Sequence, residues 1–281
     1  MIKGHSGFSV LFENDIVIKK SNSIDNNQRL RNQKEKQENF PIIYDNVEIP
    51  EIFEDGFDEK GLYYFKMKYY NKHNFVNLFE ISNKYDLKYF TEIIINFITK
   101  NIKSSKIQLL DNELILKKFA DIKTKISKNT ICKRNNYVIN DSLVIKCVQN
   151  IKEIPYGVNH GDLTLSNVLF DVYNKKIILI DFLDSFIETP YNDIIKMKQD
   201  SEIKWSLNLI NFEYDFVKIN IVLDHIDEII NKELNIDNDI YLLFQYINLL
   251  RVMQYVNDDK IFNFLKKNID RYEKLINSSC G

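Results

Sequence analysis

Three polar residues in the second half of the chain stand at a spacing that points to one kind of chemistry. Asp162 is followed five residues later by Asn167, and Asp181 ends the apolar run 177–180. In phosphoryl transfer from Mg·ATP, one carboxylate orients the acceptor hydroxyl, while a carboxamide and a second carboxylate hold Mg²⁺ against the phosphates. Asp162 is therefore the candidate catalytic residue, and Asn167 and Asp181 are the candidate metal ligands. The alternative is a turn whose polar side chains only satisfy backbone donors.

A β-hairpin is predicted to bring the two candidate metal ligands together. Residues 168–170 and 177–180 are typical of strands, and the polar residues 173–175 between them are typical of a turn. A two-stranded ribbon fixes its two open ends side by side. We therefore expect Asn167, at the entry, and Asp181, at the exit, to reach the same metal ions.

The catalytic segment also carries a family resemblance. His160, Asp162 and Asn167 match the pattern His-x-Asp-x-x-x-x-Asn of the protein-kinase catalytic loop. With glycine in the second position, His-Gly-Asp resembles the aminoglycoside phosphotransferase and choline kinase branch of the kinase-like fold, whose members phosphorylate small molecules. The chain is also similar to phosphotransferases of bacterial surface-polysaccharide pathways. The resemblance implies transfer of the γ-phosphoryl group of ATP to a hydroxyl of a small molecule, with Mg²⁺.

The same resemblance implies a fold and a division of the chain. The fold would be α+β and bilobal, with a small N-terminal antiparallel sheet plus one helix and a larger, mainly helical C-terminal lobe. Residues 1–70 would form the nucleotide-covering lobe, and residues 71–281 the catalytic and acceptor-binding lobe. Apolar residues at spacings of three and four predict the helices of that lobe. These helices are expected over 74–98, 109–126, 141–151, 212–232, 240–257 and 261–276.

The segment after Asp181 departs from the protein-kinase pattern. Leu183 replaces the glycine of Asp-Phe-Gly, which disfavours a flipping activation segment of the protein-kinase type. Residues 186–196 resemble the Gly-x-Pro-x-x-Asp-Leu-Ala segment of small-molecule kinases. Asp193 would there hydrogen-bond the backbone of the catalytic loop. His160 is interpreted as a structural imidazole, because an aspartate already fills the position of the base.

The N-terminal residues predict a phosphate-covering hairpin. Gly4, Ser6 and Gly7 lie at a tight turn, where backbone N–H groups can approach phosphate oxygens without interference from Cβ atoms. The run 16–19 resembles the third-strand Val-Ala-Ile-Lys of kinases, which implies that Lys19 contacts the α- and β-phosphates. An ordinary hairpin is the alternative.

Two further nucleotide contacts follow from the resemblance. Residues 28–40 predict a helix that Pro41 ends, and in the kinase fold a glutamate on this helix pairs with the strand lysine. Glu35 and Glu38 compete for that role; Glu35 ranks first, with a solvated glutamate as the alternative. The strand expected over 62–70 ends where kinase-like folds cross between lobes, so Met67 and Tyr69 are expected beside the adenine edge; a plain core strand is the alternative.

Composition excludes several other classes of protein. A net charge of −2 over 281 residues argues against a nucleic-acid-binding surface, and a Walker-type phosphate loop is absent. No segment approaches the roughly 18 uninterrupted apolar residues of a membrane span. Cys132, Cys147 and Cys280 have no metal-ligand spacing, so a reduced, cytoplasmic protein is expected. The oligomeric state stays open, as does the choice between ATP and GTP.

The resemblance to phosphotransferases of surface-polysaccharide pathways favours a sugar or a choline-type alcohol as the acceptor, with an aminoglycoside as a further candidate, but the residues themselves do not define it. A choline-like or aminoglycoside-like cation would require acidic pocket walls, whereas a sugar would require aromatic and amide groups. Candidate lining residues are Trp205, Asp200 and Arg251, and the acidic candidates are Asp193, Asp200, Glu202, Glu213 and Asp215. Two rival hypotheses remain: a protein-kinase-like enzyme and a nucleotide-binding pseudoenzyme that acts as an interaction module. The His-Gly-Asp form argues against the first, and the intact Asp162, Asn167 and Asp181 set argues against the second.

Overall fold

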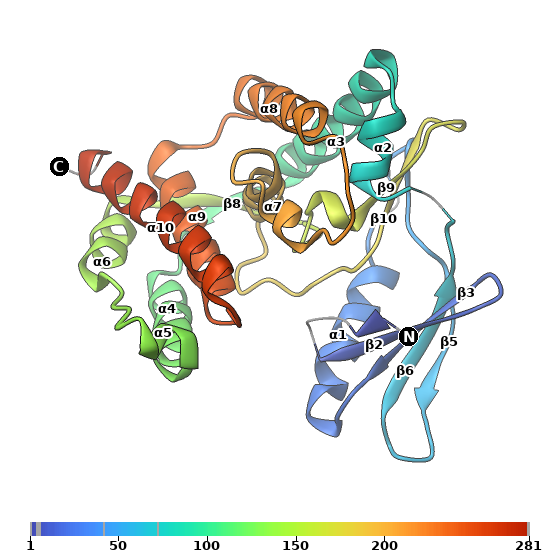
Figure 1. Ribbon diagram of the computed structural model, residues 1–281, viewed down its shortest axis with the longest axis horizontal. Coiled ribbons are helices and arrows are strands. Elements are labelled where there is room, and N and C mark those ends of the chain that lie inside the picture. Colours follow the sequence, from blue (N-terminus) through green and yellow to red (C-terminus); the bar gives the residue numbers. More distant parts are fainter. Residues whose placement is uncertain (1, 4–6, 42, 72, 280–281) are drawn as a thin grey trace.

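The computed structural model describes residues 2–3, 7–41, 43–71 and 73–279, and it has the expected α+β organisation. Figure 1 shows a small sheet with one helix at the lower right and a larger, mainly helical part in the rest of the molecule. In the part of the chain that the structure describes, no helix is both long enough and apolar enough to span a membrane.

The N-terminal sheet is antiparallel and presents Lys19 to the helix that covers it. Its strand order is β1-β2-β3-β6-β5. The strands are β1 (Ile2–Lys3), β2 (Phe8–Glu13), β3 (Ile16–Ser21), β5 (Ile52–Phe57) and β6 (Tyr63–Lys68), and the helix is α1 (Asn27–Glu38). Burial alternates along β3, so Val17, Lys19 and Ser21 share the covered face. Leu30 of α1 packs in the same small core as Val17.

Between α1 and β5 the chain passes through the larger part before it completes the N-terminal sheet. The short strand β4 (Val47–Glu48) pairs in parallel with β10 (Lys176–Leu179), which also pairs with β9 (Val168–Asp171). Phe40 and Tyr44 are buried in the core of the larger part. The division at residue 70 stays a prediction, and Phe40, Tyr44 and strand β4, which precede that boundary, pack with the larger part.

The larger part contains most of the helices. They are α2 (Phe75–Ile81), α3 (Lys84–Ser104), α4 (Asn112–Lys128), α5 (Thr130–Arg134), α6 (Asp141–Asn150), α7 (Tyr191–Ser201), α8 (Phe216–Glu233), α9 (Asn238–Met253) and α10 (Asp259–Ser279). Short 3₁₀ helices lie at Ile24–Asn26, Leu165–Asn167 and Trp205–Leu209, and β7 (Lys106–Leu109) pairs with β8 (Glu153–Tyr156).

Several expected helices have other bounds in the structure, and two of these differences have a clear local cause. The single helix expected over 74–98 is two helices, α2 and α3, because the side chain of Asn83 accepts hydrogen bonds from the amides of Tyr85 and Asp86 and starts a new helix. The helix expected from residue 109 begins later, since residues 106–109 form strand β7. A strand of four exposed residues has no burial pattern that a sequence-based prediction can detect.

Helix α7 is the rigid centre of the larger part. Every residue from Asp193 to Ser201 is buried. Ile195 belongs to the hydrophobic core formed with α4, α6, α9 and α10, whereas Ile194 and Met197 belong to the core formed with α2, α3, α8 and the β9–β10 hairpin. Polar side chains on α7 are therefore held by tight packing on both sides.

Candidate active site

The loop before β9 contains the His160-Gly161-Asp162 segment, and its backbone touches the segment that follows β10. Gly161 has φ +85°, and a Cβ atom at this position would lie 1.9 Å from the carbonyl oxygen of Leu183. The amide of Leu183 also donates to the carbonyl of His160, at 3.1 Å. Only glycine fits between the two segments. The glycine that carries the family resemblance therefore has a steric reason in this chain.

His160 braces the loop in a single protonation state. The imidazole is buried, its Nε2 lies 2.9 Å from the carbonyl of Ile180, and its Nδ1 accepts from the amide of Asp162 at 3.3 Å. This pattern corresponds to a neutral ring with the proton on Nε2. Burial lowers the pKa of His160 to about 4, despite the nearby Asp162 carboxylate. The ring also packs against Phe182, so the geometry fits the structural role expected for it.

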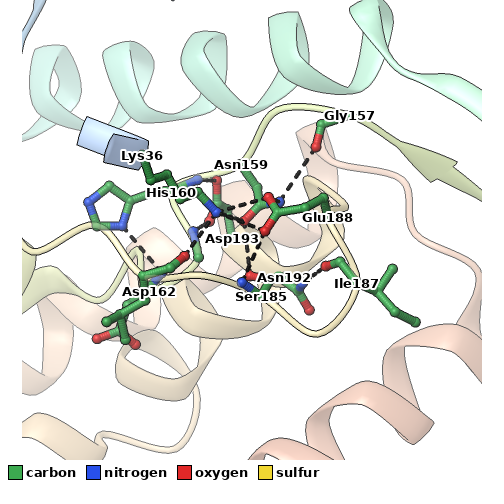
Figure 2. Close-up of polar contacts among 12 residues, drawn as sticks. Lys36, Gly157, Asn159, His160, Asp162, Ser185, Ile187, Glu188, Asn192 and Asp193 are labelled. Atoms are coloured by element: carbon green, nitrogen blue, oxygen red, sulfur yellow. Dashed lines mark hydrogen bonds and ion pairs between the residues drawn. The ribbon is translucent and has the colours of Figure 1, made fainter. Parts of the chain in front are cut away.

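Asp193, in the first turn of α7, holds the same loop from the other side. Its two carboxylate oxygens accept from the amides of His160, at 2.8 Å, and Gly161, at 3.0 Å. Figure 2 shows Asp193 directed at this stretch of backbone. The expected hydrogen bonding of Asp193 to the catalytic loop is confirmed. Burial raises the pKa of Asp193 to about 7, against the effect of the two backbone donors.

The Asp162 carboxylate is oriented by two side chains: Asn167, which is a predicted site residue, and Lys196, which was not predicted. Asn167 Nδ2 donates to Asp162 Oδ2 at 3.0 Å, and to its backbone carbonyl at 2.8 Å. Lys196 Nζ, from the second turn of α7, lies 3.0 Å from Asp162 Oδ1. Burial pushes the pKa of Asp162 upward, but Lys196 and Arg251 outweigh it, so the pKa lies below its usual value. The signal in the sequence was the i, i+3 spacing of Asp193 and Lys196, which puts both on one face of a helix.

Lys19 connects the N-terminal sheet to the end of the hairpin. Its Nζ lies 3.0 Å from Asp181 Oδ1 and 2.8 Å from Gln33 Oε1. The expected partner from α1 is therefore wrong: Glu35 is exposed, and Glu38 pairs with Lys34. Leu30, Gln33 and Gln37 form the buried face of α1, at spacings of three and four that point away from Glu35.

Asn167 and Asp181 lie at adjacent ends of the hairpin, as expected. The amide of Ile180 donates to the carbonyl of Asn167 at 3.1 Å. The NH₂ group of Asn167 faces Asp162, which leaves its carbonyl oxygen for another partner, and the Asp181 side chain is 45% exposed. Oxygen ligands of this kind fit Mg²⁺, which usually takes one or two protein groups together with water and phosphate oxygens. The described residues contain no cluster of three or more His, Cys, Asp or Glu side chains that could hold a metal ion.

An ion pair links α1 to the loop between β10 and α7. Lys36 Nζ lies 2.9 Å from Glu188 Oε2 and donates to the carbonyl of Leu183 at 2.9 Å. Glu188 also accepts from Asn159 Nδ2 at 2.8 Å and from the amide of Ser185 at 3.0 Å. Figure 2 shows Lys36 and Glu188 directed at each other above the catalytic loop. This contact ties the N-terminal helix to the loop that packs against Gly161.

The other expected nucleotide contacts are not brought into this cluster. Gly4 and Ser6 lie outside the described residues, while Gly7 adopts φ +82° and its carbonyl accepts from the amide of Asn22. The Met67 side chain is buried and its backbone pairs with β3 and β5. The amide of Tyr69 donates to the carbonyl of Asp15. Contacts of these residues with a nucleotide stay predictions.

The fold is that of the aminoglycoside phosphotransferases, which is a protein-kinase-like fold. Wild-type aminoglycoside 2'-phosphotransferase-IIIa in complex with GDP superimposes with a TM-score of 0.59 and 13% identity, covering 96% of this chain and 91% of that one. A thermostable variant of aminoglycoside phosphotransferase APH(4)-Ia, with AMP-PNP and hygromycin B, gives a TM-score of 0.56 and 11% identity, with coverages of 98% and 95%. No protein-family model and no curated relative matches the sequence. The expected likeness to aminoglycoside phosphotransferases is thus confirmed for the fold.

Proposed function

We propose that this protein is a small-molecule kinase that transfers the γ-phosphoryl group of ATP or GTP to a hydroxyl of its acceptor. The observation that carries the proposal is the double orientation of Asp162 by Asn167 and Lys196. Lys19 reaches the same site from the N-terminal sheet through its ion pair with Asp181. Structures that share the fold include complexes with GDP and with AMP-PNP, which supports nucleotide use. The same proposal includes a role in surface-polysaccharide synthesis and a cytoplasmic location.

The roles of the residues follow from the contacts. Asp162, kept ionised by Lys196, accepts the proton of the acceptor hydroxyl while the acceptor oxygen forms a bond to the γ-phosphorus. The bond between that phosphorus and the β–γ bridging oxygen breaks, and the nucleoside diphosphate leaves with the electron pair. Lys19 neutralises charge on the nucleotide phosphates. Asn167 and Asp181 would hold Mg²⁺, which supplies further neutralisation of phosphate charge when it is bound.

Thermal unfolding with nucleotides tests the nucleotide site. Mg·ATP or Mg·GTP at a hundred times its dissociation constant should add about 2.7 kcal/mol of stability. Asp181→Asn should lose the magnesium-dependent part of this shift. Asp184→Asn is the matched control, because Asp184 is exposed, lies three residues away and carries the same charge. Absence of a shift with both nucleotides would exclude the kinase, and binding without transfer to any hydroxyl or water would favour the pseudoenzyme.

A further inference from the structure

A narrow cavity lies beside the catalytic segment, between α7 and α9. Its volume is about 20 Å³, and its lining includes Gly161, which precedes Asp162. Helix α7 contributes Lys196, and helix α9 contributes Phe244, Asn248 and Arg251 at spacings of three and four. A volume of this size accepts one water-sized group. The cavity therefore fits a single functional group of a ligand whose remaining atoms lie outside it.

The charge at this cavity is positive, and none of its lining residues is acidic. Lys196 is neutralised by Asp162. The half-buried guanidinium of Arg251, by contrast, has no ion pair or hydrogen bond with any side chain among residues 7–41, 43–71 and 73–279. Lys118 of α4 also has no ion-pair partner there, and its pKa is lowered by burial and by the nearby Arg251. The carboxylates nearest to these two cations, Asp162 and Asp121, already form ion pairs with Lys196 and Lys125, so an additional anion beside Arg251 would lower the free energy of the protein.

Asn248 supplies a second, independent sign of a ligand. Its side chain is 5% exposed, and its Nδ2 donates to Gln199 Oε1 at 2.8 Å. Its Oδ1, however, is buried and has no hydrogen-bond partner among the described residues. A buried acceptor without a donor costs about 1–3 kcal/mol. A hydroxyl group in the cavity would satisfy this oxygen, one helical turn from Arg251.

Four of the five acidic residues expected to surround a cationic acceptor are engaged elsewhere. Asp193 holds the catalytic loop, and Asp200 Oδ2 accepts from the amide of Leu165. Glu202 pairs with Lys198, and Asp215 caps the start of α8. None of these carboxylates lines the cavity, so a polyamine such as an aminoglycoside, or a quaternary ammonium such as choline, finds no counter-charge in it.

We propose that this cavity takes one hydroxyl of the acceptor and that the acceptor is a hydroxylated anion, whose carboxylate or phosphate group binds Arg251 outside the cavity while another of its hydroxyls faces Asp162. The inference rests on the proposed kinase function and adds the chemical class of the substrate. Lys118 would strengthen anion binding from α4, and Asn248 would accept from a hydroxyl of the same molecule. Phe244 forms an apolar wall of the cavity.

Anion binding is tested without turnover by using sulfate as the probe. The unfolding midpoint is measured in sodium sulfate and in sodium chloride at equal ionic strength, for the unaltered protein, Arg251→Gln and Lys117→Gln. Lys117→Gln is the matched control, because it removes one positive charge from the exposed side of α4. Sulfate should stabilise the unaltered protein and the control more than Arg251→Gln. Equal responses of all three proteins would overturn the inference.

The class of acceptor is tested with pairs of compounds that differ in charge. Phosphate transfer from Mg·ATP and Mg·GTP is measured to D-glucuronate, glucose 6-phosphate, D-glucose, choline and kanamycin. A charged sugar should exceed D-glucose in kcat/KM by roughly 10- to 100-fold, the range of one charge-assisted hydrogen bond, and Arg251→Gln should abolish this preference. Comparison of D-glucuronate with glucose 6-phosphate shows whether the site prefers a carboxylate or a phosphate group. Better transfer to choline, kanamycin or D-glucose would overturn the inference and leave the kinase function intact.

A third outcome concerns the nucleotide. If Arg251 binds nucleotide phosphates instead, Arg251→Gln will raise the KM for ATP and leave the KM for the acceptor unchanged, which also overturns the inference. If no nucleotide stabilises the protein, the kinase proposal fails, and the sulfate measurement still decides whether Arg251 binds an anion.

Discussion

Lys196 Nζ lies 3.0 Å from Asp162 Oδ1, so the positive charge next to the proposed base comes from helix α7 and not from the catalytic loop itself. Three residues earlier, Asp193 accepts from the amides of His160 and Gly161. One buried helix face thus positions both the backbone of the catalytic segment and its carboxylate. Because α7 packs in two hydrophobic cores, this arrangement is rigid.

Replacing Lys196 by methionine should reduce kcat by about 100-fold, because Asp162 loses the partner that orients it. The pKa of Asp162 should rise, since burial then acts without the opposing cation. The acidic limb of the profile of kcat/KM against pH should therefore move to higher pH. Lys196→Arg, which keeps the charge, should retain more activity. An unchanged acidic limb in Lys196→Met would show that the lysine has only a packing role.

The sequence predicted the local parts of this site better than its long-range parts. The hairpin with Asn167 and Asp181 at its ends, and the contact of Asp193 with the loop, depend on short spacings that a motif contains. The pairing of β4 with β10 was not predicted, because a two-residue strand has too few residues to show a period, and its partner is far along the chain. The role of Lys196 was not predicted either, because its partner Asp162 is brought to it by the packing of α7 against the loop and not by closeness in the sequence.

The partner of Lys19 shows how burial decides between similar candidates. Gln33 and Glu35 are two residues apart on α1, so they lie on opposite sides of the helix. Charge favoured Glu35, but the buried face of α1 contains Leu30 and Gln33. A neutral amide in this place leaves Asp181 as the carboxylate that pairs with Lys19.

Gln33→Ala should therefore raise the KM for the nucleotide by about 10-fold, because the Lys19 ammonium loses one of its two side-chain partners. Glu35→Ala, on the exposed side of the same helix, should change the KM by less than a factor of two and stability by less than about 0.5 kcal/mol. Initial rates at varied ATP and GTP concentrations measure both variants. The reverse order of effects would restore Glu35 as the partner.

The protonation of His160 predicts a pH dependence of stability. Its pKa is about 4 in the folded protein and about 6.5 when unfolded, so the unfolded state binds more protons between these values. The stability that the neutral ring contributes is fully present above pH 6.5 and is lost as the pH falls toward 4. Between pH 7 and pH 5 this loss amounts to about 2 kcal/mol.

Urea unfolding at pH 7 and pH 5 tests this with His160→Gln, which keeps a donor for Ile180 and an acceptor for the amide of Asp162 but cannot be protonated. Between pH 7 and pH 5, the free energy of unfolding of the variant should fall by about 2 kcal/mol less than that of the unaltered protein. Asp193 and Asp200, with pKa values raised by burial to about 7 and about 6, act in the opposite direction in both proteins and cancel in the comparison. His225→Gln, at an exposed position, should follow the unaltered protein. If all three proteins lost the same free energy of unfolding between pH 7 and pH 5, a neutral, buried His160 would be excluded.

Gly161→Ala should destabilise the protein by more than about 2 kcal/mol and abolish transfer, because the new methyl group meets the carbonyl of Leu183 and the residue has positive φ. The loop can relieve the clash only by breaking the contacts of the Gly161 amide with Asp193 and of Leu183 with His160. Gly61→Ala is the matched control: it also has positive φ, +72°, but a Cβ atom there meets no other atom within 4 Å. It should cost about 1 kcal/mol and leave activity unchanged. Equal costs for the two variants in urea unfolding would show that backbone strain alone, and not the contact between the two segments, requires glycine in the catalytic loop.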